Sequence, residues 1–382
     1  MTLLSQVFDI YIDLNITFAI TALVWLGAKA LMERSGAKLA FSVQLGLLNG
    51  LFAVIVVSPV LAGFYRELLG AGVVPANLTV NLSDYAVSQY MRGGISISAQ
   101  DFQSLLGLRA RVTEDILSLG SLPSVAAVTL LLLGSAMFGT KLLVNFLRLN
   151  RMLSACHEWR RQGKVQLLLS DTALVPFSAR GLFRHYVVIP TELLASPEDL
   201  NLVLKHEFEH LRQGDVTWEI ALEMLRPFFF WNPFFYLWKS EVERLRELAC
   251  DQKVAENAHV DLKTYCMCLM RAAQSGLKKR QAQIGLNRSG VAAVALIEVQ
   301  DRLLRRSPAQ KLRRRLEALL DSGRIRPHGA IVALVVAPMA AVVFMTALSI
   351  QKPADWSQDR LMLSAIVNLE RLETINSFGQ RP

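Results

Sequence analysis

Five consecutive residues, His206-Glu207-Phe208-Glu209-His210, place two histidines four positions apart and a glutamate directly after the first. On a helix, residues four apart project from one face, so both imidazoles can reach one metal ion. A glutamate beside that ion can accept a proton from an activated water molecule. The chain has only six histidines in 382 residues, which makes a chance match rare. The alternative is a surface helix with an accidental spacing. We favour one zinc ion per chain, with His206 and His210 as ligands and Glu207 as the base.

A third ligand should come from elsewhere, because catalytic zinc usually has three protein ligands and one open position. Residues 241–251 have helical character and place Glu247 and Asp251 four apart on one face. We predict that Glu247 is the third ligand and that Asp251 is an outer partner that fixes a histidine tautomer. Glu241 and Glu243 are the alternatives, and we expect both to be solvated.

The composition indicates a membrane protein. Hydrophobic residues make up 52% of the chain and charged residues 19%, and the mean hydropathy is +0.33. A soluble protein normally carries more charge. A membrane span needs about 20 apolar residues, and the alternative for any single run is a buried core helix. We predict four spans from four uncharged runs, of which the first extends past Lys29 by snorkelling and the third contains Pro123, a residue suited to a helix start. The runs are residues 14–28, 40–64, 116–140 and 329–351.

Basic residues in the connecting segments predict the orientation. Of the 41 Lys and Arg residues, 29 lie between Arg148 and Arg326, whereas none precedes Leu14. We therefore expect the N-terminus outside, without a cleavable signal peptide, and the large segment in the cytoplasm. The net charge of +9 then reflects membrane orientation, and no direct nucleic-acid binding is expected. The basic tract Lys311–Arg315 is expected to anchor at the lipid bilayer.

The predicted organisation has six parts. They are two N-terminal transmembrane helices (1–64), an extracytoplasmic loop (65–115) long enough for a small helical cap, a third transmembrane helix (116–147), a cytoplasmic domain with the zinc site (148–328), a fourth transmembrane helix (329–351) and a short extracytoplasmic tail (352–382). Residues 227–238 contain eight aromatics and two prolines but are too short to span a bilayer. We interpret them as an interfacial hairpin, with a soluble aromatic core as the alternative.

Several blocks resemble the BlaR/MecR-type integral-membrane zinc metallopeptidases, an antirepressor family. The resemblance covers over half of the chain, although His185 stands where a proline is usual. It implies a gluzincin-like α+β peptidase domain between the third and fourth spans, with zinc held by His206, His210 and Glu247 and with Glu207 as base. The matching blocks are residues 178–190, 206–215, 231–233, 246–251 and 312–316.

The resemblance also implies an activity and a location. We expect peptide-bond hydrolysis in the bacterial cytoplasmic (inner) membrane, as part of transmembrane signalling, with Arg244 and His259 as candidates for stabilising the oxyanion or contacting substrate. An edge strand near residues 187–189 would align the substrate by strand addition. The protein substrate is either a cytoplasmic regulator, such as a transcriptional repressor, or the chain itself. The alternatives are a quality-control protease of the HtpX type and a non-catalytic receptor that retains zinc.

The predicted tail differs from that of the β-lactam receptors, which carry a penicillin-binding sensor domain after the fourth span. Here about thirty residues follow that span, without an S-x-x-K motif. We therefore expect a separate extracytoplasmic sensor or self-association to supply the stimulus.

Overall fold

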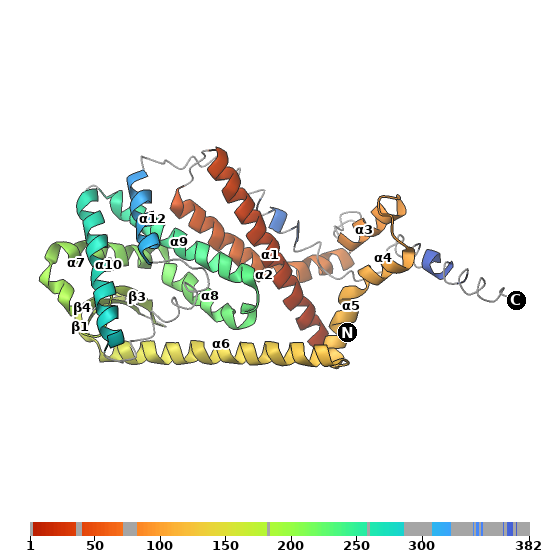
Figure 1. Cartoon of the computed structure of the whole chain (residues 1–382), viewed down its shortest axis with the longest axis horizontal. Coiled ribbons are helices and arrows are strands. Elements are labelled where there is room, and N and C mark those ends of the chain that lie inside the picture. The colour runs from red at the N-terminus through yellow and green to blue at the C-terminus, as the bar shows by residue number, and fades with distance from the viewer. Residues whose placement is uncertain are drawn as a thin grey trace. The chain divides into compact units, whose positions relative to one another are not determined.

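The computed structural model describes residues 3–35, 40–71, 82–181, 184–257, 260–285 and 308–321, with a few short pieces after residue 338. In this part of the chain the structure is mainly helical, with one four-stranded sheet (Figure 1). The chain divides into two compact units. Unit 1 consists of Met1–Ala28, Gly50–Leu133 and Leu334–Pro382, and unit 2 consists of Lys29–Asn49 and Gly134–Ala333. Unit 2 contains the segment that carries the HExxH motif.

Among the described residues, three helices are long and apolar enough to cross a membrane, which indicates a membrane protein. The first two predicted spans lie within α1 and α2. The predicted fourth span and the tail fall largely outside the described residues. The three helices are α1 (Leu3–Ser35), α2 (Phe41–Gly70) and α6 (Leu122–Ala155).

The third span was predicted to begin six residues before its helix does. Ile116 belongs to α5 (Leu108–Ser118), and the chain leaves the helix at Leu119, whose φ is 52°. Helix α6 then starts at Leu122, with Pro123 in its first turn as expected. A run without charges does not reveal this break, because the break consists of a backbone turn between two uncharged segments.

The predicted extracytoplasmic loop contains three short helices, in agreement with the expected helical cap. Val87 and Phe102, from the first two of these helices, are buried in one cluster, and the Phe102 ring stacks on Tyr90 with the centroids 4.4 Å apart. These contacts form a small apolar cluster within unit 1. The helices are α3 (Leu82–Met91), α4 (Ala99–Leu106) and α5.

The sheet of unit 2 has the strand order β1-β2-β4-β3. Strands β2 and β4 are parallel, and the other two pairs are antiparallel. Strands β3 and β4 cover the matching block at residues 178–190, which precedes the helix with the HExxH motif. The strands are β1 (His157–Gln162), β2 (Val165–Ser170), β3 (Phe177–Arg180) and β4 (His185–Pro190).

The prediction of an edge strand at residues 187–189 is wrong, because β4 is paired on both sides and the two edge strands are β1 and β3. Val187 and Ile189 pack on one face against α7, including Phe208. Val188 packs on the other face in a cluster with Leu153 of α6. A continuous apolar run of this kind is typical of a strand that is covered on both faces.

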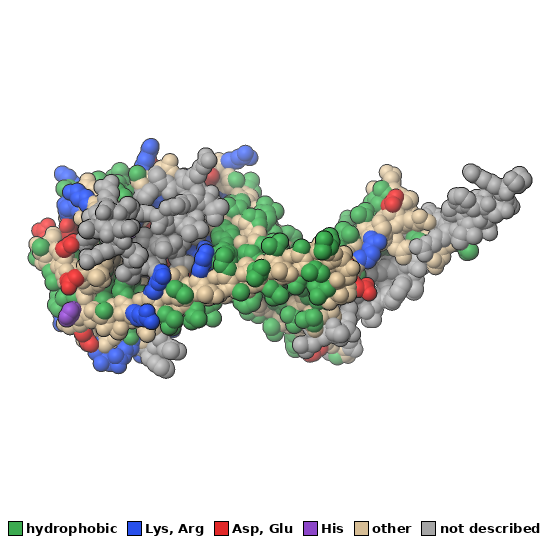
Figure 2. Space-filling view, turned by 60° about the horizontal axis from the view of Figure 1, so that its bottom comes forward, with side chains coloured by type: hydrophobic (Ala, Val, Ile, Leu, Met, Phe, Trp, Pro, Cys, Tyr) green, Lys and Arg blue, Asp and Glu red, His purple; other side chains and the backbone are tan. Residues whose placement is uncertain are grey.

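The sheet begins directly after the third candidate span. Only Cys156 separates Ala155, the last residue of α6, from His157, the first residue of β1. Met152 is buried, and Leu153 packs in the cluster beneath β4. Figure 2 shows hydrophobic side chains along much of α6 and Lys and Arg side chains gathered towards its sheet end. The helix therefore continues into the folded unit without a flexible linker.

Five helices complete the described part of unit 2, after a 3-10 turn at Thr191–Ala195. Four of them contribute to one apolar core, formed by Leu202, Val254, Tyr265, Cys268 and Leu319. The helices are α7 (Pro197–Gln213), α8 (Asp215–Phe229), α9 (Pro233–Ala255), α10 (Leu262–Gly285) and α12 (Pro308–Asp321).

The aromatic segment forms the end of α8, a short turn and the start of α9. Its side chains divide between core and surface: Phe235 and Trp238 are buried, whereas Phe228 and Trp231 are 55% and 49% exposed. Phe230 stacks on Phe138 of α6, with the centroids 5.5 Å apart. The segment is thus partly a core, as in the alternative interpretation, and partly an exposed aromatic surface beside a candidate span.

Candidate metal and catalytic site

Helix α7 carries the HExxH residues, and its amphipathic pattern sets their direction. Ser196 precedes Pro197 at the first helical position, and Gly214 ends the helix in the left-handed region with φ 72°. One face of α7 packs on the sheet, and His206 and His210 lie on a neighbouring face, one helical turn apart. The apolar residues that pack on the sheet are Leu200, Leu204, Phe208 and Leu211.

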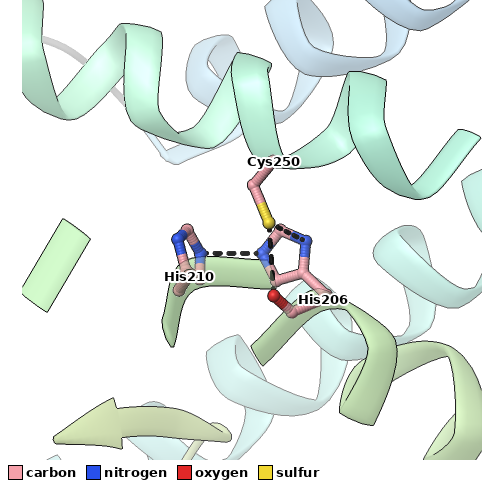
Figure 3. A group of neighbouring side chains, drawn as sticks. All are labelled: His206, His210 and Cys250. Atoms are coloured by element: carbon pink, nitrogen blue, oxygen red, sulfur yellow. Dashed lines mark hydrogen bonds between the residues drawn. The ribbon is translucent and has the colours of Figure 1, made fainter. Parts of the chain in front are cut away.

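Three side chains predicted as ligands converge. The Nε2 atoms of His206 and His210 lie 3.2 Å apart, and the two rings are nearly perpendicular (Figure 3). Glu247, from α9, places Oε2 3.8 Å from His206 Nε2 and Oε1 3.8 Å from His210 Nε2. Ligand atoms on a tetrahedral zinc ion lie about 3.3 Å apart. The two imidazoles and the carboxylate therefore fit one zinc ion.

A cysteine, Cys250, also lies within 4.8 Å of the two histidines. Figure 3 shows it approaching from α9, with Sγ 3.3 Å from Nδ1 of His206 and 3.2 Å from its backbone oxygen. Burial, followed by the nearby charges of Glu247 and Asp251, raises the pKa of Cys250 well above its usual range. Its sulfur faces Nδ1 and the backbone oxygen of His206, whereas the Glu247 carboxylate faces the Nε2 atoms of both histidines. The two histidines and Glu247 are thus the better donor set.

His210 is held in one tautomer by Asp215, the first residue of α8. Asp215 Oδ2 accepts a hydrogen bond from Nδ1 over 2.8 Å, which leaves Nε2 without a proton for a metal. Burial acts to lower the pKa of His210, but the hydrogen bond to Asp215 and the charges of Glu247 and Glu207 raise it overall. The left-handed turn at Gly214 allows α8 to start at once and brings Asp215 back to His210.

His206 is oriented through a tyrosine. Its Nδ1 lies 3.0 Å from the Tyr265 hydroxyl and 3.4 Å from Asp251 Oδ1. Tyr265 donates its hydroxyl proton to Asp251 over 2.7 Å, so its oxygen is free to accept from Nδ1 of His206. Asp251 therefore acts on the histidine largely through Tyr265, and again Nε2 remains available.

An arginine from α12 closes the outer side of the site. Arg315 binds Asp251 with two hydrogen bonds, of 2.7 Å from Nε and 2.6 Å from Nη2, and its Nη1 lies 3.0 Å from Glu247 Oε2. Burial would raise the pKa of Glu247, but the charge of Arg315 and the two histidines lower it well below its usual range. Glu247 is therefore charged, as a metal ligand must be.

Glu207 is buried and tied to the edge strand. Ser178 Oγ, in β3, donates a hydrogen bond to Glu207 Oε2 over 2.6 Å and lies 3.1 Å from the Glu207 backbone oxygen. This contact fixes the carboxylate beside the two histidines. A cavity of about 680 Å³ opens here, with Glu207, Glu247 and β3 in its wall. The other wall is apolar and includes Met152 and Leu269. Its size suits an extended peptide or a drug-sized ligand.

Of the two residues predicted to contact the substrate or the oxyanion, only Arg244 belongs to the described part of the chain. Arg244 is paired with Glu241 at 2.6 Å and does not line the cavity, so the structure does not support a substrate or oxyanion role for it. Glu241 itself is buried and also binds Lys29 at 2.9 Å, so the expectation that it is solvated is wrong. Periodicity placed these side chains on α9 but could not show which face is covered. His259 lies outside the described residues.

Four residues that complete the site received no role from the sequence. Ser178, Asp215 and Arg315 lie in the blocks that carry the family resemblance, and this was the available signal. The sequence contains no such signal for Tyr265, because it is a single tyrosine in an ordinary helical stretch. Arg315 was expected only to anchor at the bilayer, but it reaches inward because α12 packs on the core beneath the site.

Comparison with known families bears directly on this arrangement. A model of the BlaR1 peptidase M56 family matches residues 12–297. The chain belongs to the M56 peptidase family. The matched region of this M56 peptidase includes the HExxH motif, Glu247, Asp251 and Tyr265, and it ends before α12. Comparison with curated proteins gave no match. Membership of the family confirms the resemblance to BlaR/MecR-type peptidases.

Proposed function

We propose that the chain is a membrane-embedded zinc endopeptidase that hydrolyses peptide bonds in a cytoplasmic regulator or in itself during transmembrane signalling. One observation carries the proposal: two imidazole Nε2 atoms and a charged carboxylate converge beside a buried glutamate in a cavity bordered by an edge strand. His206, His210 and Glu247 would hold the zinc ion. Family membership supports the peptidase class, and the three apolar helices support a membrane location.

Zinc bound to these residues would lower the pKa of a water molecule to about 7 and polarise the scissile carbonyl group. Glu207 accepts the proton of the attacking water and delivers it to the leaving amine. Ser178 keeps the Glu207 carboxylate aimed at the cavity during both transfers. Asp215, Tyr265 and Asp251 hold the histidines in the tautomer that exposes Nε2.

Strand β3, instead of β4, is the element suited to align a substrate. Among the described strands, β3 is paired on one side only, and its other edge offers backbone donors and acceptors to an extended peptide. Ser178 lies at its centre, so a peptide paired with this edge would pass close to Glu207. The exposed aromatic residues Phe228 and Trp231, beside α6, would keep this site near the bilayer surface. Substrates would then be proteins that are membrane-bound or docked at the membrane.

The test compares the wild-type chain with Glu207→Gln in bacterial membranes, and follows the chain and candidate regulators by immunoblot. Glu209→Gln is the matched control, because Glu209 lies in the same motif but is bound by Arg212 and Gln213. We expect cleavage with wild type and Glu209→Gln and none with Glu207→Gln. Identical fragments from all three would exclude the protease. Broad Glu207-dependent cleavage of misfolded membrane proteins would replace the signalling role with quality control.

A further inference from the structure

We propose that Arg315 is a positioning residue of the metal site, so that the site is complete only while α12 is docked. This inference rests on the proposed function, since it concerns how the ligands for zinc are held. Arg315 contacts two carboxylates at once, one from the ligand Glu247 and one from its neighbour Asp251. Among the described residues, no other Lys or Arg forms an ion pair with Glu247 or Asp251.

The geometry assigns different tasks to the three nitrogens of Arg315. Nε and Nη2 form a planar fork on Asp251, which is almost completely buried at 1% side-chain exposure. Asp251 accepts from Tyr265, and Tyr265 faces His206. Nη1 contacts Oε2 of Glu247, and the other oxygen of this carboxylate, Oε1, does not take part in the contact. One guanidinium group thus orients both a histidine and a carboxylate of the site.

A charge argument leads to the same conclusion. The buried carboxylates around the histidines are costly without a compensating positive charge. Arg315 supplies that charge before any metal arrives, and so the ligands are already arranged. A lysine would supply the charge but not the planar fork. The position therefore requires arginine for geometry as well as for charge.

Helix α12 presents Arg315 and Leu319, one turn apart, to the rest of the unit. Leu319 is 4% exposed and packs with Leu202 and Tyr265 in the core, whereas its neighbour Leu320 is 74% exposed. The same apolar contact that docks α12 therefore sets the position of Arg315. Loss of this apolar contact would also displace Arg315 from Glu247 and Asp251.

The experiment uses the full-length chain purified in detergent, with zinc affinity measured by competition with a chromophoric chelator. Cobalt(II) spectra report the geometry of the ligands independently of peptidase activity. Arg315→Gln should lower zinc affinity about 10–100-fold, the usual effect of removing an outer partner, and alter the cobalt spectrum. Arg315→Lys should recover part of the affinity. Arg313→Gln is the matched control, because Arg313 is exposed and bound to Glu317.

A second pair of variants tests docking without touching the site. Leu319→Ala should lower zinc affinity in the same direction, whereas Leu320→Ala should leave it unchanged. Wild-type affinity and spectra in both Arg315→Gln and Leu319→Ala would overturn the inference, as would full recovery in Arg315→Lys. If Arg315→Gln does not fold, the zinc affinities of Arg315→Lys and Leu319→Ala test the inference instead. A wild-type chain without zinc would overturn the proposed function as well, whereas zinc binding that depends on His206 but not on Arg315 would overturn this inference alone.

Discussion

Ser178 of the edge strand β3 donates a hydrogen bond to Oε2 of Glu207 on α7, and the two oxygens lie 2.6 Å apart. The contact joins the element suited to align a peptide to the residue proposed to move the proton. Any shift of β3 would therefore also move the Glu207 carboxylate. The pair offers the most direct test of whether substrate alignment and proton transfer depend on each other.

Ser178→Ala should lower kcat/KM by roughly 10–100-fold, because a hydrogen bond to a charged group contributes about 1.5–3 kcal/mol. Ser178→Thr keeps the hydroxyl and should retain most of the activity. Zinc content should be the same in both variants, since Ser178 contacts no proposed ligand. Steady-state cleavage of a reporter peptide by the purified chain measures the effect. Equal activity in Ser178→Ala and wild type would show that the contact does not matter for catalysis.

The choice of third ligand predicts opposite results for two residues of α9. Glu247→Gln should lower zinc affinity by more than about 100-fold, since even outer partners contribute 10–100-fold. Cys250→Ser should leave the affinity nearly unchanged. The cobalt-substituted wild type should also lack a thiolate charge-transfer band. A strong band that disappears in Cys250→Ser would instead identify the cysteine as ligand.

Asp215→Asn should reduce zinc affinity about 10–100-fold, because the negative charge that fixes the His210 tautomer is lost. Asp171→Asn provides a control, since Asp171 is bound to Thr191 on the surface. Chelator competition in detergent measures both variants. An affinity for Asp215→Asn that equals that of the control would show that His210 is oriented by other contacts.

A pH-dependent contribution to stability is expected from Asp199, in the first turn of α7. The hydrogen bonds from Arg271 lower the pKa of Asp199, and burial opposes them only partly. A lowered folded-state pKa stabilises the protein above the unfolded value of about 3.9, and this contribution is lost as the pH falls through the folded value. Because Arg271 is well exposed, Asp199→Asn should cost only about 1 kcal/mol at pH 7. Thermal unfolding should show this difference shrinking below about pH 4; a difference independent of pH would exclude the ion pair as its cause.

Two glycines of α6 form a matched pair. A Cβ at Gly134 would collide with the Phe230 ring, whereas one at Gly139 meets no described atom within 4 Å. Gly139→Ala should gain up to about 1 kcal/mol of helix propensity. Gly134→Ala should be the less stable of the two by about 1–3 kcal/mol, because the ring must move. Thermal unfolding of both variants checks this, and equal stability would mean that the aromatic turn does not pack on α6.

Helix periodicity predicted that His206 and His210 share one face of α7 and that Glu247 and Asp251 share one face of α9, and the structure brings these two faces together. The same periodicity could not predict how α9 is covered, and so Arg244 was assigned to the site although it pairs with Glu241. Tyr265 and Arg315 come from separate helices. Their approach to the site depends on tertiary packing around Leu202 and Leu319, which the sequence does not display.

Hydropathy located α1, α2 and α6 but not all of their ends, since α1 begins at Leu3 although the predicted span begins at Leu14. It failed at the start of α6, where a left-handed residue at Leu119 ends one helix without any change in polarity. The family resemblance likewise suggested an edge strand at residues 187–189, although the run from Val187 to Ile189 is covered on both faces. In both cases the deciding factor was the backbone path, not the composition.

The single residue between α6 and β1 has a mechanical consequence. Only Cys156 lies between the helix and the strand, and Leu153 packs against the sheet, so the junction contains no flexible hinge. Rotation or tilt of the helix must turn the sheet, and with it the β3 edge that borders Glu207. In the proposed membrane peptidase, the β3 edge would thus keep a constant distance from the sheet end of α6, and this distance would limit which bonds of a membrane-docked substrate can reach Glu207.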